Sequence, residues 1–239
     1  MKTVKFLMAI AIVTAIEADV CCFAQKNDAK KERKELIREN KKAEKNFYKK
    51  SPKLARKTAK EWEREGWRSM NHPIEKQLEK TWALEAPVDE YGYPKYVSVT
   101  VDVTATNYSA AQMQAENVAK VRIAGNLCTT VEALGNLALA NNETTPELTA
   151  SISKAVENAQ LRVSQKLGRV LPGVTVYRER DGKYEVRMIV LYDQRQAASI
   201  AQQIVLDELK AESEENKRRL ESILGVDAIQ KAYNDKFAE

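Results

Sequence analysis

Apolar and polar residues alternate strictly at the start of the central part of the chain. From residue 97 to residue 106, valine or alanine fills the odd positions, and serine, threonine or aspartate fills the even positions. Side chains on a β-strand point alternately to its two faces, so a period of two is typical of a strand with one buried face. The pattern predicts a strand that begins at about Tyr96.

Two further β-rich runs, Val174 to Arg180 and Lys183 to Tyr192, follow later in the chain. Only Asp181 and Gly182 separate them, and this dipeptide tolerates the positive φ angles of a tight hairpin turn. The runs therefore predict a β-hairpin.

A two-residue turn places Arg178 opposite Glu185, which is a favourable cross-strand pair. The same register places Val176 opposite Arg187, so the inward face of the hairpin is not purely apolar. A bulge near Gly182 is the alternative that would change this pairing.

Between the strands, apolar residues recur at helical spacing from Ser109 to Ala140 and from Thr145 to Val170. Ser109 is the expected N-cap of the first helix, and Pro146 suits the first turn of the second. The expected buried stripe comprises Met113, Val121, Ala124, Cys128, Val131 and Leu134 in the first helix, and Leu148, Ile152, Ala155, Ala159, Val163, Leu167 and Val170 in the second. We expect the two helices to form a hairpin over one face of the sheet.

These elements predict an α+β fold, in which helices cover a small, mostly antiparallel sheet built from a strand, a helical hairpin and a β-hairpin. The core domain is expected over residues 96–193, with a helical extension over residues 194–239. A helix from Gln194 to Leu224 is expected to end near Gly225 and lead into a short helical tail. Charged residues make up 31% of the chain and its mean hydropathy is -0.51, which favours long exposed helices.

Residues 1–24 are typical of a signal peptide. Lys2 and Lys5 precede an apolar run, Phe6 to Ile16, that is too short to span a bilayer. Small residues then allow cleavage between Ala24 and Gln25. The alternative is a buried N-terminal helix, but the highly charged segment that follows favours export to the periplasm or the outer membrane.

Cys21 and Cys22 raise a second interpretation, in which one of them becomes the acylated first residue of a lipoprotein. Val20 stands before Cys21 where a small residue is wanted, and this disfavours lipidation. After ordinary cleavage Cys128 is the one remaining cysteine, so it makes no internal disulfide. Its helical position predicts a small buried hydrophobic side chain rather than a nucleophile.

Residues 25–68 form a basic arm. Between Lys26 and Lys60 there are roughly fifteen basic residues against five acidic ones. This composition indicates a solvated helix or a disordered arm, either of which could contact lipid headgroups, lipopolysaccharide phosphates or wall carboxylates. Nucleic acid is not expected as a partner, because the arm lacks regularly spaced aromatic residues for base stacking. The candidate contacts with an anionic partner are Lys30, Lys31, Lys41, Lys42, Lys49 and Lys50.

Residues 69–95 predict a helix, with Pro73 in its first turn, and a linker into the core. Trp62, Trp67 and Trp82 are too large and apolar to remain in water, so we expect this region to dock on the sheet or on a neighbouring copy. His72 is the single histidine of the chain, and we expect it in a loop and not in a zinc site.

The sequence contains no motif of a known catalytic chemistry. A Gly-rich phosphate loop, a Gly-x-Ser-x-Gly elbow and a Cys-x-x-Cys pair are all missing. Two carboxylate pairs, Asp102 with Glu116 and Glu179 with Glu185, are conceivable for acid/base work, but exposed carboxylates on strands and helices are usually solvated surface. We therefore expect no enzymatic activity, no cofactor and no metal.

Five segments of the core, taken together, carry a resemblance. They are Tyr108-Ser109-Ala110-Ala111, Ala115-Glu116-Asn117-Val118-Ala119, Gln165-Lys166-Leu167-Gly168, Gly173-Val174-Thr175-Val176-Tyr177 and Tyr184-Glu185-Val186-Arg187-Met188. In this order, after a valine-rich strand, they resemble the LPP-twenty family of bacterial envelope proteins, which includes outer-membrane lipoproteins and the flagellar basal-disc protein. The end of the signal peptide, Phe23-Ala24-Gln25, is similar to those of exported Bacteroidetes proteins.

The resemblance covers residues 96 to 193 and implies a small α+β module that assembles side by side near the outer membrane, without catalysis. The long basic arm and the poor lipidation motif depart from the family. We accordingly expect a non-catalytic exported envelope protein that forms homo-oligomers or binds envelope proteins. The alternative is a periplasmic binding or regulatory module that recognises an envelope polymer or a partner protein through its arm.

Overall fold

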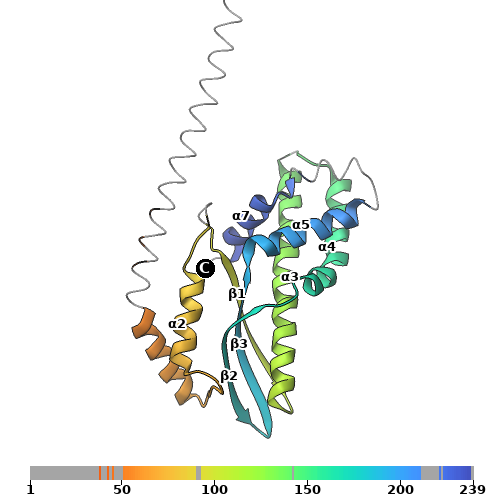
Figure 1. Ribbon diagram of the computed structural model, residues 1–239. Helices are drawn as coiled ribbons and strands as arrows, with labels where there is room; N and C mark the ends of the chain where they lie inside the picture. Colours follow the sequence, from red (N-terminus) through yellow and green to blue (C-terminus); the bar gives the residue numbers. More distant parts are fainter. Residues whose placement is uncertain are drawn as a thin grey trace, which may run out of the picture.

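The computed structural model describes residues 51–89, 93–141, 143–210, 221 and 223–237, together with residues 38, 42 and 45. This part of the chain has an α+β fold, as the sequence predicts, with helices packed on a three-stranded antiparallel sheet (Figure 1). The elements in order are a helix over residues 51–64, α2 (Ile74–Glu85), β1 (Tyr96–Ala105), α3 (Tyr108–Ala140), α4 (Pro146–Lys166), β2 (Leu171–Arg180), β3 (Lys183–Asp193), α5 (Gln194–Lys210) and α7 (Val226–Phe237).

The strands lie in the order β1-β3-β2, so β3 is the central strand and is paired on both sides. Asp181 and Gly182 both have positive φ angles, 52° and 69°, and form the two-residue turn between β2 and β3. Arg178 lies opposite Glu185 and Val176 opposite Arg187, which confirms the simple hairpin register. The one register shift of this ladder falls at the start of β2, between Pro172 and Val174, rather than near Gly182.

The first face of the sheet packs against α3. The odd-numbered valines of β1 and the central residues of β3 are buried there with the helices in one hydrophobic core. With 33 residues at about 1.5 Å each, α3 is roughly 50 Å long, whereas a ten-residue strand spans about 34 Å. The helix therefore extends beyond the sheet, and its far part packs with α4, α5 and α7 (Figure 1). The expectation that both helices of the hairpin cover the sheet is wrong in this respect, because α4 packs chiefly on α3 and α5.

The buried stripe of α3 agrees only in part with the expected one, since Ala124, Cys128 and Val131 are buried as expected. Met113 is 67% exposed and Val121 is 47% exposed. The sheet-facing positions are instead Ala111, Ala115 and Ala119, which are fully buried at a spacing of four residues. Small side chains let the helix approach the strands closely, so burial follows the alanines here and not the larger residues.

The helix begins one residue earlier than expected. Asn107, and not Ser109, is the N-cap, and its side-chain oxygen accepts a hydrogen bond from the Ala110 backbone N–H at 2.8 Å. All seven residues of the stripe expected for the second helix are buried, but α4 ends at Lys166, so Leu167 and Val170 lie just beyond the helix rather than in it.

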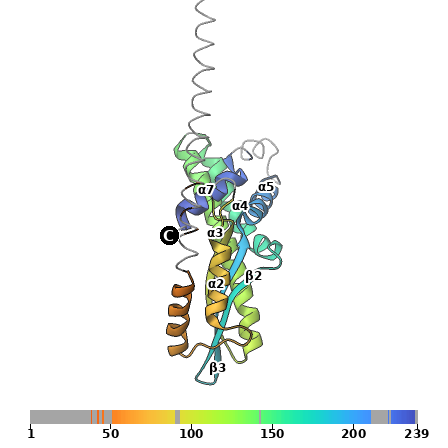
Figure 2. The same cartoon turned by 60° about the vertical axis from the view of Figure 1, so that its left-hand side comes forward.

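A second hydrophobic core lies on the opposite face of the sheet. Helix 51–64 and α2 lie side by side there (Figures 1 and 2). Its buried members are Ala55, Ala59, Trp67, Ile74 and Leu78 from these segments, and Val174 and Val176 from β2. Of the two docking alternatives, the structure shows packing on the sheet, with Trp62 and Trp82 partly buried at its border.

In the C-terminal part α5 and α7 follow β3 in the predicted order, whereas residues 211–220 of the helix expected from Gln194 to Leu224 lie outside the described residues. In α5 the buried side chains include Ala197, Ala201 and Val205, and α7 begins directly after Gly225. The predicted signal peptide, residues 1–24 with Cys21, Cys22 and Ala24, lies outside the described residues, as does Gln25 after the predicted cleavage. The same holds for all the candidate contact lysines of the arm except Lys42, which is helical and exposed.

At Gly173 the β2 backbone lies tightly against Thr81 of α2. A Cβ atom at this position would lie 2.7 Å from Leu191 Cδ1 and 2.7 Å from Thr81 Oγ1. Both neighbours are fully buried, so neither can move aside freely.

We predict that Gly173→Ala lowers the free energy of unfolding by about 1–3 kcal/mol, because the added methyl group overpacks the contact between α2 and β2. Urea denaturation followed by circular dichroism measures the change. Gly225→Ala is the matched control, since no atom lies within 4 Å of the position that its added methyl group would occupy. Equal stability of the two variants would contradict the close approach.

Candidate functional site

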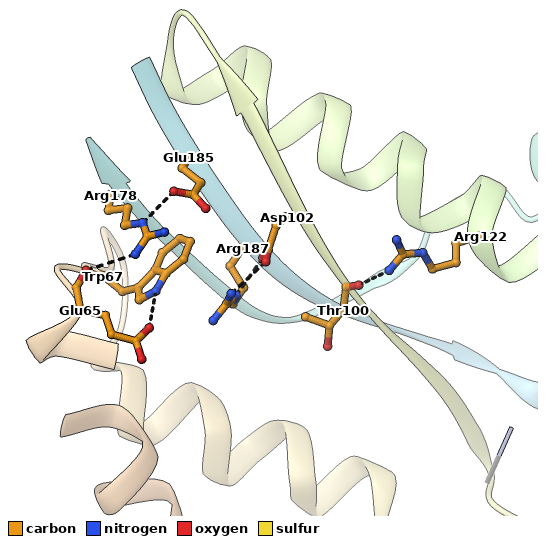
Figure 3. Close-up of polar contacts among 8 residues, drawn as sticks. All are labelled: Glu65, Trp67, Thr100, Asp102, Arg122, Arg178, Glu185 and Arg187. Carbon is orange, nitrogen blue, oxygen red and sulfur yellow. Dashed lines mark hydrogen bonds and ion pairs between the residues drawn. The ribbon is translucent and has the colours of Figure 1, made fainter. Parts of the chain in front are cut away.

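A stack of two arginines on one tryptophan lies on the second face of the sheet (Figure 3). Trp67 is only 1% exposed and lies beneath the guanidinium groups of Arg178 and Arg187, whose Cζ atoms are 4.4 Å and 4.7 Å from its ring centroid. Its indole N–H donates to Glu65 Oε2 at 3.2 Å. A guanidinium over an indole ring is a favourable cation–π contact, so the stack fixes the loop after helix 51–64 on the sheet.

Carboxylates hold both guanidinium groups in place. Arg187 donates two hydrogen bonds to Asp102, each 2.8 Å long, and Arg178 Nε donates to Glu185 Oε2 at 2.7 Å. These hydrogen bonds are the main cause of the raised pKa of each arginine. The cluster is therefore a set of closed ion pairs, and it joins strands and loop without offering a group that exchanges a proton at neutral pH.

Neither of the two carboxylate pairs considered from the sequence is assembled. Glu185 pairs with Arg178 on the second face, whereas Glu179 accepts a hydrogen bond from Tyr184 on the first face. Asp102 also belongs to the second face, opposite to the one that α3 and its Glu116 cover. Alternation along the strands separates the partners in both cases.

The remaining candidate groups lie apart from one another. His72 is in the exposed loop between helix 51–64 and α2, as expected. Cys128 is buried in α3, and burial raises the pKa of its thiol to about 11, so the thiol remains protonated at neutral pH. Within the described ranges, no three histidine, cysteine or acidic side chains come together as a metal site.

The outer edge of β2 is covered. The backbones of Arg68 and Tyr177 exchange two hydrogen bonds, of 2.7 Å and 2.8 Å. Beside them, the Thr175 N–H donates to Gln77 Oε1 at 2.8 Å. Pro172 and the register shift after it end regular pairing at the start of this strand. These are recognised ways in which natural sheets protect an edge.

The outer edge of β1 is different. The backbone N–H and C=O groups of Tyr177 point outward to Arg68 and not toward β3. Because these backbone groups alternate in direction along antiparallel ladders, the N–H and C=O groups of the even-numbered residues of β1 point away from β3. The Arg122 side chain donates to the Thr100 carbonyl at 2.5 Å (Figure 3). No strand or bridge of the described chain pairs with this edge. Its outward residues, whose side chains are also exposed, are Ser98, Thr100, Asp102 and Thr104.

A cavity of about 400 Å³ lies where loop 69–72, α2, the start of β2 and the start of α3 meet. Gln77 fixes its wall, because the side-chain amide donates to Ser69 Oγ at 2.5 Å and to the His72 carbonyl at 2.7 Å while its oxygen accepts from Thr175. No carboxylate is among the residues that line this cavity. It is the second feature, beside the β1 edge, that is open to a partner.

The arginine–tryptophan stack and the Gln77 clamp were not found from the sequence. One signal for the stack was present, because the hairpin register places Arg187 opposite the apolar Val176 and a charge on an inward face requires a partner. Gln77 has no comparable signal, since its partner Thr175 is 98 residues away in the chain.

In comparisons with known proteins, no family model, no curated protein and no solved structure matches this chain. Across the described residues, every helix is too short or too polar to cross a membrane.

We predict that Arg187→Lys lowers the free energy of unfolding by about 1–2 kcal/mol. Lysine keeps the charge but loses both the two-pronged contact with Asp102 and the flat contact with Trp67. Chemical denaturation monitored by tryptophan fluorescence measures the loss. Arg180→Lys, in the exposed end of the hairpin, is the control and should change stability by less than about 0.5 kcal/mol. A similar small effect at both positions would show that the stack is not a stabilising contact.

We also predict that Gln77→Met destabilises the fold by about 1–3 kcal/mol, because the Thr175 N–H and the loop lose their partners while the side-chain length is kept. Hydrogen exchange at the Thr175 amide should accelerate in the variant. Gln165→Met, at an exposed position near the end of α4, is the matched substitution and should leave both measurements unchanged. An unaltered Thr175 exchange rate in Gln77→Met would refute the clamp.

Proposed function

We propose that this protein is a non-catalytic, exported module that self-associates through the open edge of β1. The observation that carries the proposal is the contrast between the two edges of one small sheet. The β2 edge is closed by a backbone bridge, a side-chain amide and a proline. Among the described residues, the ten-residue β1 edge pairs with no strand or bridge and is contacted by side chains, from Arg122 at the Thr100 carbonyl and from Glu85 at Ser98.

An unpaired strand edge is a template for another strand. The outward positions of β1 hold no lysine and no proline, the residues that most often prevent such pairing. Serine, threonine and valine fill most of the strand, and β-branched residues pack well in a sheet. The edge is therefore suited to pairing.

A second copy of β1 is the partner that fits this edge best. Antiparallel pairing of two identical strands is a two-fold symmetric interface and would join two three-stranded sheets into one continuous sheet. Among the symmetric registers, only the one that opposes Asp102 to itself brings like charges together. Registers centred on Thr100 or Val101 oppose Asp102 to Ser98 or Thr100 and set the buried valine rows in line.

The proposed cellular location and the proposed side-by-side assembly rest on the sequence. The predicted signal peptide would direct the mature chain, from Gln25 onward, to the periplasm or the outer membrane, with lipidation at Cys21 or Cys22 as the alternative mode of attachment. The resemblance to the LPP-twenty family supports side-by-side assembly in the envelope.

The alternative function, recognition of an anionic envelope polymer or partner protein through the basic arm, rests on sequence alone. Of its candidate lysines only Lys42 belongs to the described residues, where it is exposed. It remains a prediction without a structural observation in its favour.

We predict that the mature chain forms a discrete oligomer in light scattering across a concentration series, and that Thr100→Pro weakens assembly at least about tenfold. The Thr100 N–H faces away from β3, where proline is tolerated in an edge strand, so the monomer should still fold. Thr100→Lys is a second variant that blocks the edge by charge. Gln165→Lys adds the same charge at an exposed position of α4 and should assemble like the wild type.

The two parts of the proposal fail separately. A wild-type chain that stays monomeric at hundreds of micromolar would refute self-association. A wild-type oligomer that persists in both Thr100 variants would refute the β1 edge as the interface and leave self-association standing.

A further inference from the structure

The cavity beside loop 69–72 has a wall that is fixed before any ligand arrives. Gln77 ties the loop to α2 and to the β2 backbone, and Gly173 allows Thr81 of α2 to lie directly against β2. A volume of about 400 Å³ lies within the range usual for small-molecule sites. A site held in this way loses little conformational freedom when it binds.

The groups that line this cavity are mostly hydrogen-bond donors. Lys76 and Lys80 lie one turn apart on α2, and Asn71, His72 and Gln112 add nitrogen donors. The Lys76 ammonium is paired with Glu79 at 2.7 Å, whereas Lys80 has no ion-pair partner among the residues that the structure describes. With no carboxylate in the lining, the cavity favours an anionic group near Lys80.

One wall of the cavity carries less polar surface. Tyr108, at the start of α3, is held edge-on against Tyr177 with ring centroids 5.2 Å apart, and Pro172 lies nearby at the start of β2. Burial raises the pKa of Tyr108, so its hydroxyl remains a donor at neutral pH. A flat apolar surface bordered by amide and hydroxyl groups suits the ring of a sugar.

We propose that this cavity binds an acidic sugar unit, with the carboxylate of the sugar at Lys80 and its hydroxyls at Asn71, Gln112 and Tyr108. A single inorganic oxyanion would fill only a fraction of the volume and would leave the neutral donors unused. A neutral sugar would leave Lys80 without a partner. The inference does not depend on pairing at the β1 edge, because the cavity is formed by loop 69–72, α2, β2 and α3.

The test is an NMR titration of the ¹⁵N-labelled mature chain with glucuronate, with glucose and inorganic phosphate as parallel probes. We expect saturable shifts at the lining residues with glucuronate, and affinities at least fivefold lower for glucose and for phosphate. Lys80→Gln should weaken glucuronate binding at least fivefold. Lys183→Gln, an exposed lysine at the far end of the β2–β3 hairpin, should bind as the wild type does.

Each contrary result overturns a defined part of the inference. Phosphate binding as tight as that of glucuronate would reduce the site to a general anion site, and glucose binding of equal strength would remove the role of Lys80. No saturable shift at the lining residues would exclude the site altogether. Lys80 is exposed, so its substitution should leave the fold intact, and the amide spectrum of the variant verifies this directly.

Discussion

In a three-stranded sheet only the central strand is paired on both sides. The helices and loops of this structure therefore have to cover the two faces of the sheet and the outer edges of the other two strands. β3 is paired on both sides, whereas β1 and β2 each form one outer edge of the sheet. Both faces of the sheet carry apolar side chains. The long helix α3 buries one face by presenting alanines to it, and helix 51–64 with α2 buries part of the other. Once these helices are placed, the backbone of Arg68 and the amide of Gln77 close the β2 edge. The β1 edge is the part that this arrangement leaves open.

The second face combines apolar packing with closed ion pairs. Val174 and Val176 are fully buried beneath helix 51–64 and α2, yet Arg187 stands opposite Val176 in the register. Its charge is accommodated because Asp102 accepts two hydrogen bonds from it and Trp67 covers it. The polar cluster therefore holds the loop after helix 51–64 on the sheet and offers no group that exchanges a proton at neutral pH.

The parts of the fold that follow local rules could be predicted from the sequence. Alternation predicts β1, the Asp181-Gly182 dipeptide predicts the hairpin and its turn, and the large aliphatic residues of α4 predict its buried stripe. The dipeptide does not decide between the simple register and a bulge near Gly182, and the structure has the simple register. The stripe of α3 is predicted correctly only in its second half, because the sheet-facing residues of the first half are alanines, whose small size gives a weak pattern. The contacts that build the candidate site join residues far apart in sequence, such as Gln77 with Thr175. A single sequence carries no local signal for such pairs.

The order of the strands along the chain has a consequence for how the molecule folds. β1 comes first, but its partner β3 lies about 85 residues later, as the pair Asp102 and Arg187 shows. Closing so long a loop is entropically costly, and contacts between distant residues slow folding. During synthesis β1 therefore has no strand partner until β3 has been made, while α3 and α4 can already associate locally. The β1–β3 pairing therefore depends on a late segment of the chain, whereas β2 and β3 are joined by a two-residue turn and can pair as soon as both have been made.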